Sequence, residues 1–292
     1  MWITKIGMSV KAFLLFLSLG LLSACQVNNI NLKPLMDASS KSSDMFEKTL
    51  EEEVELGQEV SGVLLKNSAF YNVKDVQQYV SSIGHWLAQH TERPEVPWQF
   101  AVLRDDSFNA FATPGGFIYI TTGTLSQLDN EAELAGILAH EIAHVVKKHH
   151  LAAIQKEAQV GVAVDLLKFA HDSSRDNDSS VSSSPVFADV SAESKLLNGI
   201  QDIYSNGLAR EDELEADSMG MVIAARAGYD PQAYVKVLQK IDAQQADHPF
   251  WKTFSKRHPS AKDRLTAIEK TAEDLSKIDG KTLEYRFSQE LK

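Results

Sequence analysis

Residues 130–150 read Asn-Glu-Ala-Glu-Leu-Ala-Gly-Ile-Leu-Ala-His-Glu-Ile-Ala-His-Val-Val-Lys-Lys-His-His, and the interpretation of the whole chain starts from this stretch. Its apolar residues recur at helical spacing, and Asn130 followed by a glutamate three residues later is typical of a helix start. We therefore predict a helix over residues 130–157. Within it, His140 and His144 are four residues apart, so both imidazoles lie on one helix face and can bind one metal ion.

Glu141 directly follows the first of these histidines, and its carboxylate can reach a water molecule on a metal that the two histidines hold. It continues a stripe that is otherwise apolar, formed by Leu134, Leu138 and Val145. A carboxylate in such a stripe costs desolvation energy unless a cation balances it. A metal beside the two histidines supplies that balance, which favours a metal site over a pair of surface histidines.

The next two histidines, His149 and His150, fit the surface interpretation better. Lys147 and Lys148 precede them, and cationic side chains at the C-terminal end of a helix are favoured by the helix dipole. We expect both of these histidines to be exposed to solvent.

A catalytic zinc site needs a third protein ligand and leaves one position for water. The only cysteine of the chain is Cys25, so this ligand must be a histidine or a carboxylate. Downstream, residues 210–217 read Arg-Glu-Asp-Glu-Leu-Glu-Ala-Asp and place Glu213 and Asp217 on one helix face. One of them can bind the metal while the other accepts the distal N–H of a metal-bound histidine. Spacing alone does not decide which acid is the ligand.

Composition excludes several classes of protein. The chain has 292 residues with 43% hydrophobic and 24% charged residues, which is typical of a globular protein that buries a core. Its 29 basic and 40 acidic side chains give a net charge of −11, so we expect no nucleic-acid partner. A single cysteine also excludes an intramolecular disulfide.

The N-terminus is typical of a secreted lipoprotein. Ala12–Leu22 is a run of 11 uncharged residues, too short to span a membrane but suited to the core of a signal peptide. The sequence Leu-Ser-Ala that precedes Cys25 resembles a bacterial lipobox, and the alternative is an ordinary secretory signal with an incidental cysteine. We predict a lipoprotein signal peptide over residues 1–24, lipidation at Cys25, a flexible tether over 25–46 and a folded domain over 47–292. Gln26 follows the cysteine, which by resemblance to lipoprotein sorting signals favours a periplasm-facing anchor in the outer membrane.

The remaining segments predict a mainly helical domain with a small sheet. Residues 98–103 and 117–122 have the pattern of two strands, and a turn at residues 111–116 leads into the second, so we expect a hairpin. Residues 171–185 are mostly Ser, Asp and Asn and are expected to form a surface loop. Further helices are expected at 47–66, 73–91, from about Ala192, after Asp230-Pro231 with Gly228 as the preceding stop, and from Ser260 to Lys270.

Taken together, these motifs resemble the M48 family of zinc metallopeptidases over roughly residues 52–275. The matching pieces are Asn109–Gly116, His140–His144, Arg210–Asp217 and Arg257–Ser260 with Arg264, in the order of the family. The resemblance implies an α+β, mainly helical zincin-like fold with a small β-hairpin or sheet beside the active-site helix. It also implies one zinc ion per chain with Glu213 as the third ligand, and Asp217 as the partner that orients His140.

The resemblance implies two further roles, and the composition and position of residues 171–185 suggest a third. The segment at Asn109 and Ala110 looks like the edge strand that binds extended substrate by strand addition in zincins; an ordinary hairpin is the alternative. His258 is expected near the metal, where it stabilises the oxyanion or fills the open position in a latent state. A plain loop histidine is the alternative. Residues 171–185 are expected to restrict access to the zinc together with His258, and a simple surface loop is the alternative.

The sequence therefore predicts a zinc endopeptidase that cleaves unfolded or misassembled envelope proteins, with Glu141 as the general base. The alternative is a periplasmic chaperone or assembly factor for outer-membrane proteins with weak or latent proteolysis. The soluble outer-membrane branch of the family suggests outer-membrane assembly machinery as a partner. One such branch carries a helical-repeat domain after the protease, and we expect no such domain here, which is a departure from that branch.

Overall fold

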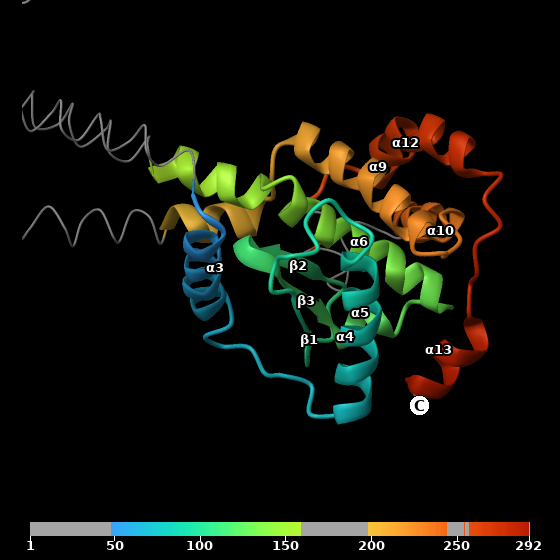
Figure 1. Ribbon diagram of the computed structural model, residues 1–292, viewed down its shortest axis with the longest axis horizontal. Coiled ribbons are helices and arrows are strands. Elements are labelled where there is room, and N and C mark those ends of the chain that lie inside the picture. The colour runs from blue at the N-terminus through green and yellow to red at the C-terminus, as the bar shows by residue number, and fades with distance from the viewer. Residues whose placement is uncertain (1–47, 159–197, 244–253, 255–256, 292) are drawn as a thin grey trace, which may run out of the picture. The chain divides into compact units, whose positions relative to one another are not determined.

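The sheet beside the central helices is built from β1 (Gln99–Leu103), β2 (Ala110–Thr113) and β3 (Phe117–Thr121), in the order β1-β3-β2 (Figure 1). The computed structural model describes residues 48–158, 198–243, 254 and 257–291. The predicted signal peptide, Cys25, the tether and the 171–185 loop lie outside the described residues. Within the described part, helices predominate over this small sheet, which confirms the α+β, mainly helical fold class.

The predicted hairpin between residues 98–103 and 117–122 is wrong, because β1 and β3 are neighbours that run parallel. The antiparallel partner of β3 is β2. A short 3-10 turn, η2 (Pro114–Gly116), joins β2 to β3, and both of its glycines have positive φ, 74° at Gly115 and 97° at Gly116. Glycine adopts this conformation without steric cost, so the chain reverses within three residues. The edge strand β2 therefore comes from a segment that the alternation pattern had assigned to a turn.

The central helix α6 (Glu131–Val146) is buried along almost its whole length. Its predicted start is confirmed, since the Asn130 side chain accepts a hydrogen bond of 3.0 Å from the backbone N–H of Glu133. Its predicted extent to residue 157 is wrong. Lys148 has a φ of 59°, which ends the helix in a turn, and the chain continues in a second helical segment from His149.

This turn also corrects the expectation for the two neighbouring histidines. His149 and His150 are 5% and 9% exposed, so they are buried and not on the surface. A single straight helix would have placed them beyond the metal-binding face. The reversal at Lys148 directs them back toward it.

Two helices, α9 (Arg210–Arg226) and α10 (Gln232–Asp242), pack on α6, and α12 (Ala261–Leu275) packs on both of them. α9 makes the most extensive contact with α6 in the described structure. The predicted helix stop is confirmed by Gly228, which has a φ of 88° just after α9 ends. The predicted start at Ser260 is confirmed too, because its side chain accepts a bond of 3.1 Å from the Asp263 N–H.

The two N-terminal helices are α3 (Leu50–Leu64) and α4 (Lys74–Ala88), close to the predicted ranges. α3 packs on the η2 turn. Its buried Glu53 lies 2.8 Å from the Arg93 guanidinium and accepts a bond of 3.2 Å from the backbone N–H of Gly115. This buried ion pair therefore connects α3, the loop after α4 and the turn before β3.

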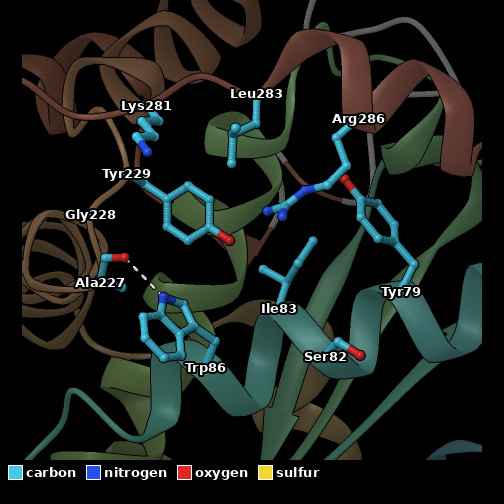
Figure 2. A pocket seen from close by; sticks show the side chains of 10 residues that line it. All are labelled: Tyr79, Ser82, Ile83, Trp86, Ala227, Gly228, Tyr229, Lys281, Leu283 and Arg286. Atoms are coloured by element: carbon cyan, nitrogen blue, oxygen red, sulfur yellow. Dashed lines mark hydrogen bonds between the residues drawn. The ribbon is translucent and has the colours of Figure 1, made fainter.

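The remaining elements are the short α5 (Thr122–Leu125) and the C-terminal α13 (Glu284–Glu290). Glu131, at the first position of α6, is fully buried and accepts hydrogen bonds from the hydroxyls of Tyr79 and Tyr229 and from Arg286. Tyr79, Tyr229 and Arg286 also line a cavity of about 460 Å³ (Figure 2). At its rim the Trp86 indole N–H donates to the carbonyl of Ala227. The cavity is thus lined by polar groups that already have partners, and it lies apart from the histidines of α6.

No helix within the described residues combines the length and the apolar character needed to cross a bilayer.

Candidate metal centre

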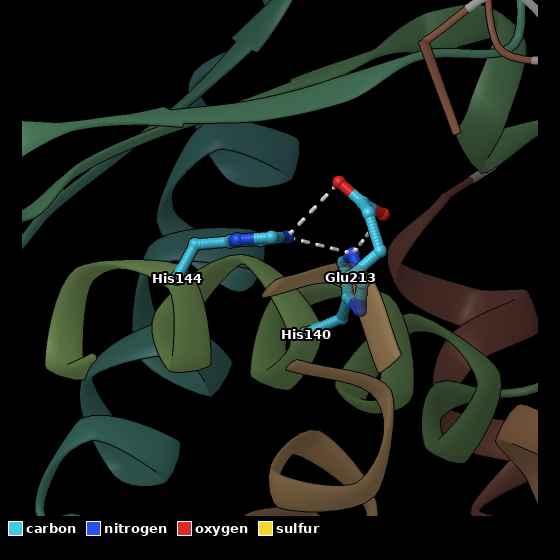
Figure 3. Close-up of side chains that lie close together, drawn as sticks. All are labelled: His140, His144 and Glu213. Carbon is cyan, nitrogen blue, oxygen red and sulfur yellow. Dashed lines mark hydrogen bonds and ion pairs between the residues drawn. The ribbon is translucent and has the colours of Figure 1, made fainter. Parts of the chain in front are cut away.

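Three side chains with metal-binding atoms converge where α6 and α9 pack together (Figure 3). His140 and His144 come from α6, and Glu213 comes from the first turn of α9. The two Nε2 atoms are 3.1 Å apart. Glu213 lies 3.7 Å from Nε2 of His140 through Oε2 and 3.6 Å from Nε2 of His144 through Oε1. All three side chains are buried.

This donor set fits zinc. Zinc binds neutral imidazole nitrogens and carboxylate oxygens at roughly 2.0–2.2 Å, so the donor atoms of a tetrahedral site lie roughly 3.3–3.6 Å apart. The two Nε2 atoms are 3.1 Å apart, and one donor atom from each of the three residues can be chosen so that all lie within 4.8 Å of one another, close enough for one ion to reach all three side chains. Two imidazoles and one carboxylate leave one tetrahedral position for water, as a catalytic site requires.

Asp217 supports the first histidine from behind. Its Oδ1 lies 2.9 Å from Nδ1 of His140 and accepts a hydrogen bond of 2.7 Å from the hydroxyl of Tyr234. Arg264 donates to both carboxylate oxygens, at 2.9 Å and 2.6 Å. Burial alone would raise the pKa of Asp217, but the charge of Arg264 and its hydrogen bonds hold that pKa well below its ordinary value. The carboxylate is therefore ionised and fixes the tautomer that leaves Nε2 of His140 free for a metal.

Arg264 and Tyr234 were not assigned roles from the sequence. Arg264 was visible only as part of a family motif, and Tyr234 follows no local pattern that separates it from a core tyrosine. Both are buried. The Arg264 guanidinium also donates to the Tyr234 hydroxyl at 2.7 Å, which closes a network around Asp217.

Glu141 is buried between two small cavities of about 30 and 20 Å³. Burial raises the pKa of its carboxyl to about 7, and the negative charge of Glu213 adds to the rise. A carboxyl group with a pKa near neutrality can both take up and release a proton. Each cavity has room for about one water molecule, so little free space surrounds this side chain in the described part of the chain.

His258 contacts Glu213 directly. Its Nδ1 is 2.5 Å from Oε2 of Glu213, and its ring stacks on Phe254 with centroids 4.3 Å apart. Burial lowers the pKa of His258, although the Glu213 carboxylate opposes this. Glu213 itself would have its pKa raised by burial, but His258 and the two α6 histidines lower it below the ordinary range. The structure thus places His258 within the cluster, bonded to a ligand through one ring nitrogen.

The strand β2 is the edge of the sheet next to this cluster. The Asn109 carbonyl accepts a bond of 3.1 Å from the Thr121 N–H and so points toward β3. In an antiparallel pair this direction alternates, so the N–H and C=O of Ala110 and Ala112 point away from β3. The hydroxyl of Tyr204 donates to the Ala112 carbonyl at 2.9 Å. The backbone of Ala110 is the part of the edge that faces the cleft, and Tyr204, whose role no sequence pattern indicated, covers the part beyond it.

Comparisons with known proteins agree with this geometry. The model of "Peptidase family M48" matches residues 74–272. The "Beta-barrel assembly-enhancing protease" of Escherichia coli (strain K12) is 25% identical over 238 residues, which cover 80% of this chain and 45% of that protein. The protein of the same name from Yersinia pestis is 31% identical over 170 residues, 56% of this chain and 32% of that one. The "Mitochondrial metalloendopeptidase OMA1" of Schizosaccharomyces pombe is 30% identical over 192 residues, 65% of this chain and 51% of that one. The chain spans about half the length, or less, of these relatives.

Proposed function

The chain belongs to peptidase family M48, and from this premise we propose that it is a zinc endopeptidase that hydrolyses extended protein segments. The observation that carries the proposal is the position of Glu141. It is buried next to two histidines and a glutamate whose donor atoms lie close enough together to hold one zinc ion. A purely structural zinc site has no use for a carboxylate held beside its ligands but bonded to none of them.

His140, His144 and Glu213 would hold the zinc, which when bound acidifies a water molecule and polarises the carbonyl group of the peptide bond. The carboxylate of Glu141 takes a proton from the attacking water and passes it to the nitrogen of the leaving amine. Burial keeps the pKa of Glu141 close to the range in which both transfers are possible. Asp217 holds the ring of His140 in the orientation that the site needs.

Substrate binding would use the edge of the sheet. The outward N–H and C=O of Ala110 can form two backbone hydrogen bonds with an extended chain, which recognises its conformation rather than its side chains. Asn109 precedes this strand and would position its start for substrate binding. Its side-chain oxygen accepts a hydrogen bond of 3.3 Å from Arg257 at the rim of the cleft. An unfolded or misassembled protein supplies an extended chain, whereas a folded domain does not.

His258 would act on the open side of the metal. We propose two states for it: in the resting enzyme it restrains the cluster through Glu213, and during turnover it stabilises the negative charge on the substrate oxygen. The contact of 2.5 Å with Glu213 supports the first state. The same position beside the ligands supports the second.

We further propose that Cys25 anchors the protein by lipid to the outer membrane, with the folded domain facing the periplasm. The substrates would then be cell-envelope proteins, and the machinery that assembles outer-membrane proteins is the proposed partner. Two relatives named for enhancing β-barrel assembly support this location and partner.

The narrow space beside Glu141 favours a second candidate function. Cavities of about 30 and 20 Å³ beside Glu141 are too small for a substrate side chain. A protein with such a resting state could serve mainly as a chaperone or assembly factor and cleave little.

One experiment separates the two functions. Glu141→Gln keeps the size of the side chain and all three proposed ligands but removes the base. We expect the variant to keep about one zinc ion per chain and to lose hydrolysis of an unfolded substrate such as casein by several orders of magnitude. Assembly of outer-membrane proteins in cells carrying this variant is the second measurement. Full loss of function there supports the protease, and full retention supports the chaperone.

A further inference from the structure

The second ring nitrogen of His144 faces another histidine. Nδ1 of His144 and Nδ1 of His149 are 3.0 Å apart, and the rings meet edge to face with centroids 5.1 Å apart. On its far side, Nε2 of His149 lies 3.4 Å from Oε2 of Glu215 and 3.9 Å from Oδ1 of Asp212. A continuous row of polar atoms therefore runs from His144 to an acidic turn of α9.

The direction of each bond in this row follows from the first. If His144 binds a metal through Nε2, its proton must be on Nδ1. That N–H can form a hydrogen bond with His149 only if Nδ1 of His149 is an acceptor. The proton of a neutral His149 is then on Nε2, where it is donated to the Glu215 carboxylate. With these two protons placed, His144 donates to His149 and His149 donates to Glu215, so every hydrogen bond in the row has one donor and one acceptor.

The two proposed histidine ligands are thus supported in different ways. His140 is held by Asp217, a fully buried carboxylate fixed by Arg264. His144 is held by a buried imidazole whose own partner, Glu215, is half-exposed and also pairs with Lys147 at 2.6 Å. The support of His144 therefore reaches the protein surface, and that of His140 does not.

The backbone explains how His149 reaches this position. α6 ends at Val146, and the positive φ of Lys148 turns the chain so that the following residue packs against the helix it has just left. In an uninterrupted helix His149 would be five residues after His144 and would point about 140° away from it. The turn at Lys148 is therefore what brings His149 into contact with His144.

We propose that His149 is a positioning residue of the metal centre: it fixes the tautomer and ring orientation of His144, and Glu215 in turn fixes His149. The inference rests on the proposed zinc site. It predicts that His149 determines how tightly the metal is held, apart from its contribution to packing.

The test uses the purified protein and measures zinc affinity by competition with a chromophoric chelator. His149→Phe keeps the ring volume but removes the acceptor, and we expect the dissociation constant for zinc to rise by about 10–100-fold, the usual effect of losing such a partner. His149→Gln, whose side-chain carbonyl can accept the same bond, should recover part of the affinity. Glu215→Gln, at a half-exposed position, should give a smaller loss in the same direction.

His150→Phe is the matched control. His150 is also a buried histidine whose ring contacts His144, but it stacks on Tyr204 and its Nδ1 has no hydrogen-bond partner among the described residues. This variant should keep the wild-type zinc affinity. The visible absorption spectrum of the Co²⁺-substituted protein provides an independent readout, since it should change in His149→Phe and not in His150→Phe.

The possible outcomes test the positioning role of His149 separately from the proposed zinc site on which it rests. If wild-type protein takes up no zinc, the metal site itself is wrong. If wild-type protein binds zinc and His149→Phe binds it equally tightly, the site stands and the positioning role is refuted. The role is also refuted if His149→Phe and His149→Gln lose affinity equally and both lower the melting temperature of the zinc-free protein, because that pattern indicates packing alone.

Discussion

Replacing Gly220 with alanine should damage the fold and the metal centre together. Gly220 lies on α9 at its crossing with α6, and a Cβ built there would be 2.9 Å from the backbone N of His140 and 3.0 Å from its Cα. Carbon atoms pack best at about 3.5–4.0 Å, so the helices must separate locally by about 0.5–1 Å. The nearest atoms belong to the backbone, so no side-chain rotation relieves the contact.

The size of the effect follows from two opposing contributions. Overpacking a core costs about 1–3 kcal/mol, whereas replacing glycine by alanine inside a helix stabilises it by about 1 kcal/mol. Gly62→Ala on α3 isolates the second contribution, because a Cβ there meets no atom within 4 Å. We expect Gly62→Ala to stabilise the protein, and Gly220→Ala to have a free energy of unfolding about 1–3 kcal/mol below that of Gly62→Ala.

Denaturant unfolding of the zinc-free proteins measures this difference. Zinc affinity is the second assay, because Glu213 lies two turns before Gly220 on the same helix. A shift of about 0.5 Å exceeds the tolerance of about 0.2 Å for zinc–ligand distances, so the affinity should fall at least about tenfold, or 1.4 kcal/mol. The reasoning is refuted if Gly220→Ala is as stable as Gly62→Ala and binds zinc as tightly as the wild type.

Three further changes test other parts of the structure. Arg93→Met should lower the free energy of unfolding by up to about 3 kcal/mol, because the buried carboxylate of Glu53 then keeps only Lys148, 3.6 Å away, as a cationic partner; unfolding in urea would show no loss if the pair contributes little. Ser260→Ala removes the side-chain cap of α12 and should cost about 1 kcal/mol in the same assay, with Ser260→Asp as the variant that restores stability. Tyr204→Phe frees the Ala112 carbonyl on the edge strand, so the KM for an unfolded substrate should fall while kcat changes little; an unchanged KM would mean that substrate does not pair with this part of the strand.

The metal-binding helix could be predicted from sequence because its signals are local. The cap at Asn130, the period of the apolar residues and the spacing of His140 and His144 all lie within one segment. Each of these is decided by neighbours three or four residues away. The same holds for Glu213 and Asp217, whose spacing showed a shared face, although only the family resemblance separated ligand from partner.

The predictions that were wrong or missing concern features that depend on contacts between segments far apart in the sequence. Nothing in residues 98–103 shows that this strand pairs in parallel with β3, since the alternation of side chains is the same in either direction. Lysine gives no local sign of a positive φ, so the turn at Lys148 was invisible, and with it the burial of His149. Tyr204 and Tyr234 also look like ordinary core residues until α6, β2 and α10 are assembled.

Each of the three ligands of the proposed zinc site either belongs to α9 or is held in place by an acidic residue of α9. Glu213 is itself a ligand, Asp217 acts on His140 directly, and Glu215 acts on His144 through His149. Because these acids belong to one rigid helix, a displacement of α9 changes all three interactions at once. Substitutions that move the helix should therefore have larger effects on zinc affinity than any single lost hydrogen bond, and pairs of substitutions within this group should be non-additive. A change at Gly220 acts on the whole group, whereas Glu215→Gln acts on one member of it, so comparing their zinc affinities measures how far the centre behaves as a unit.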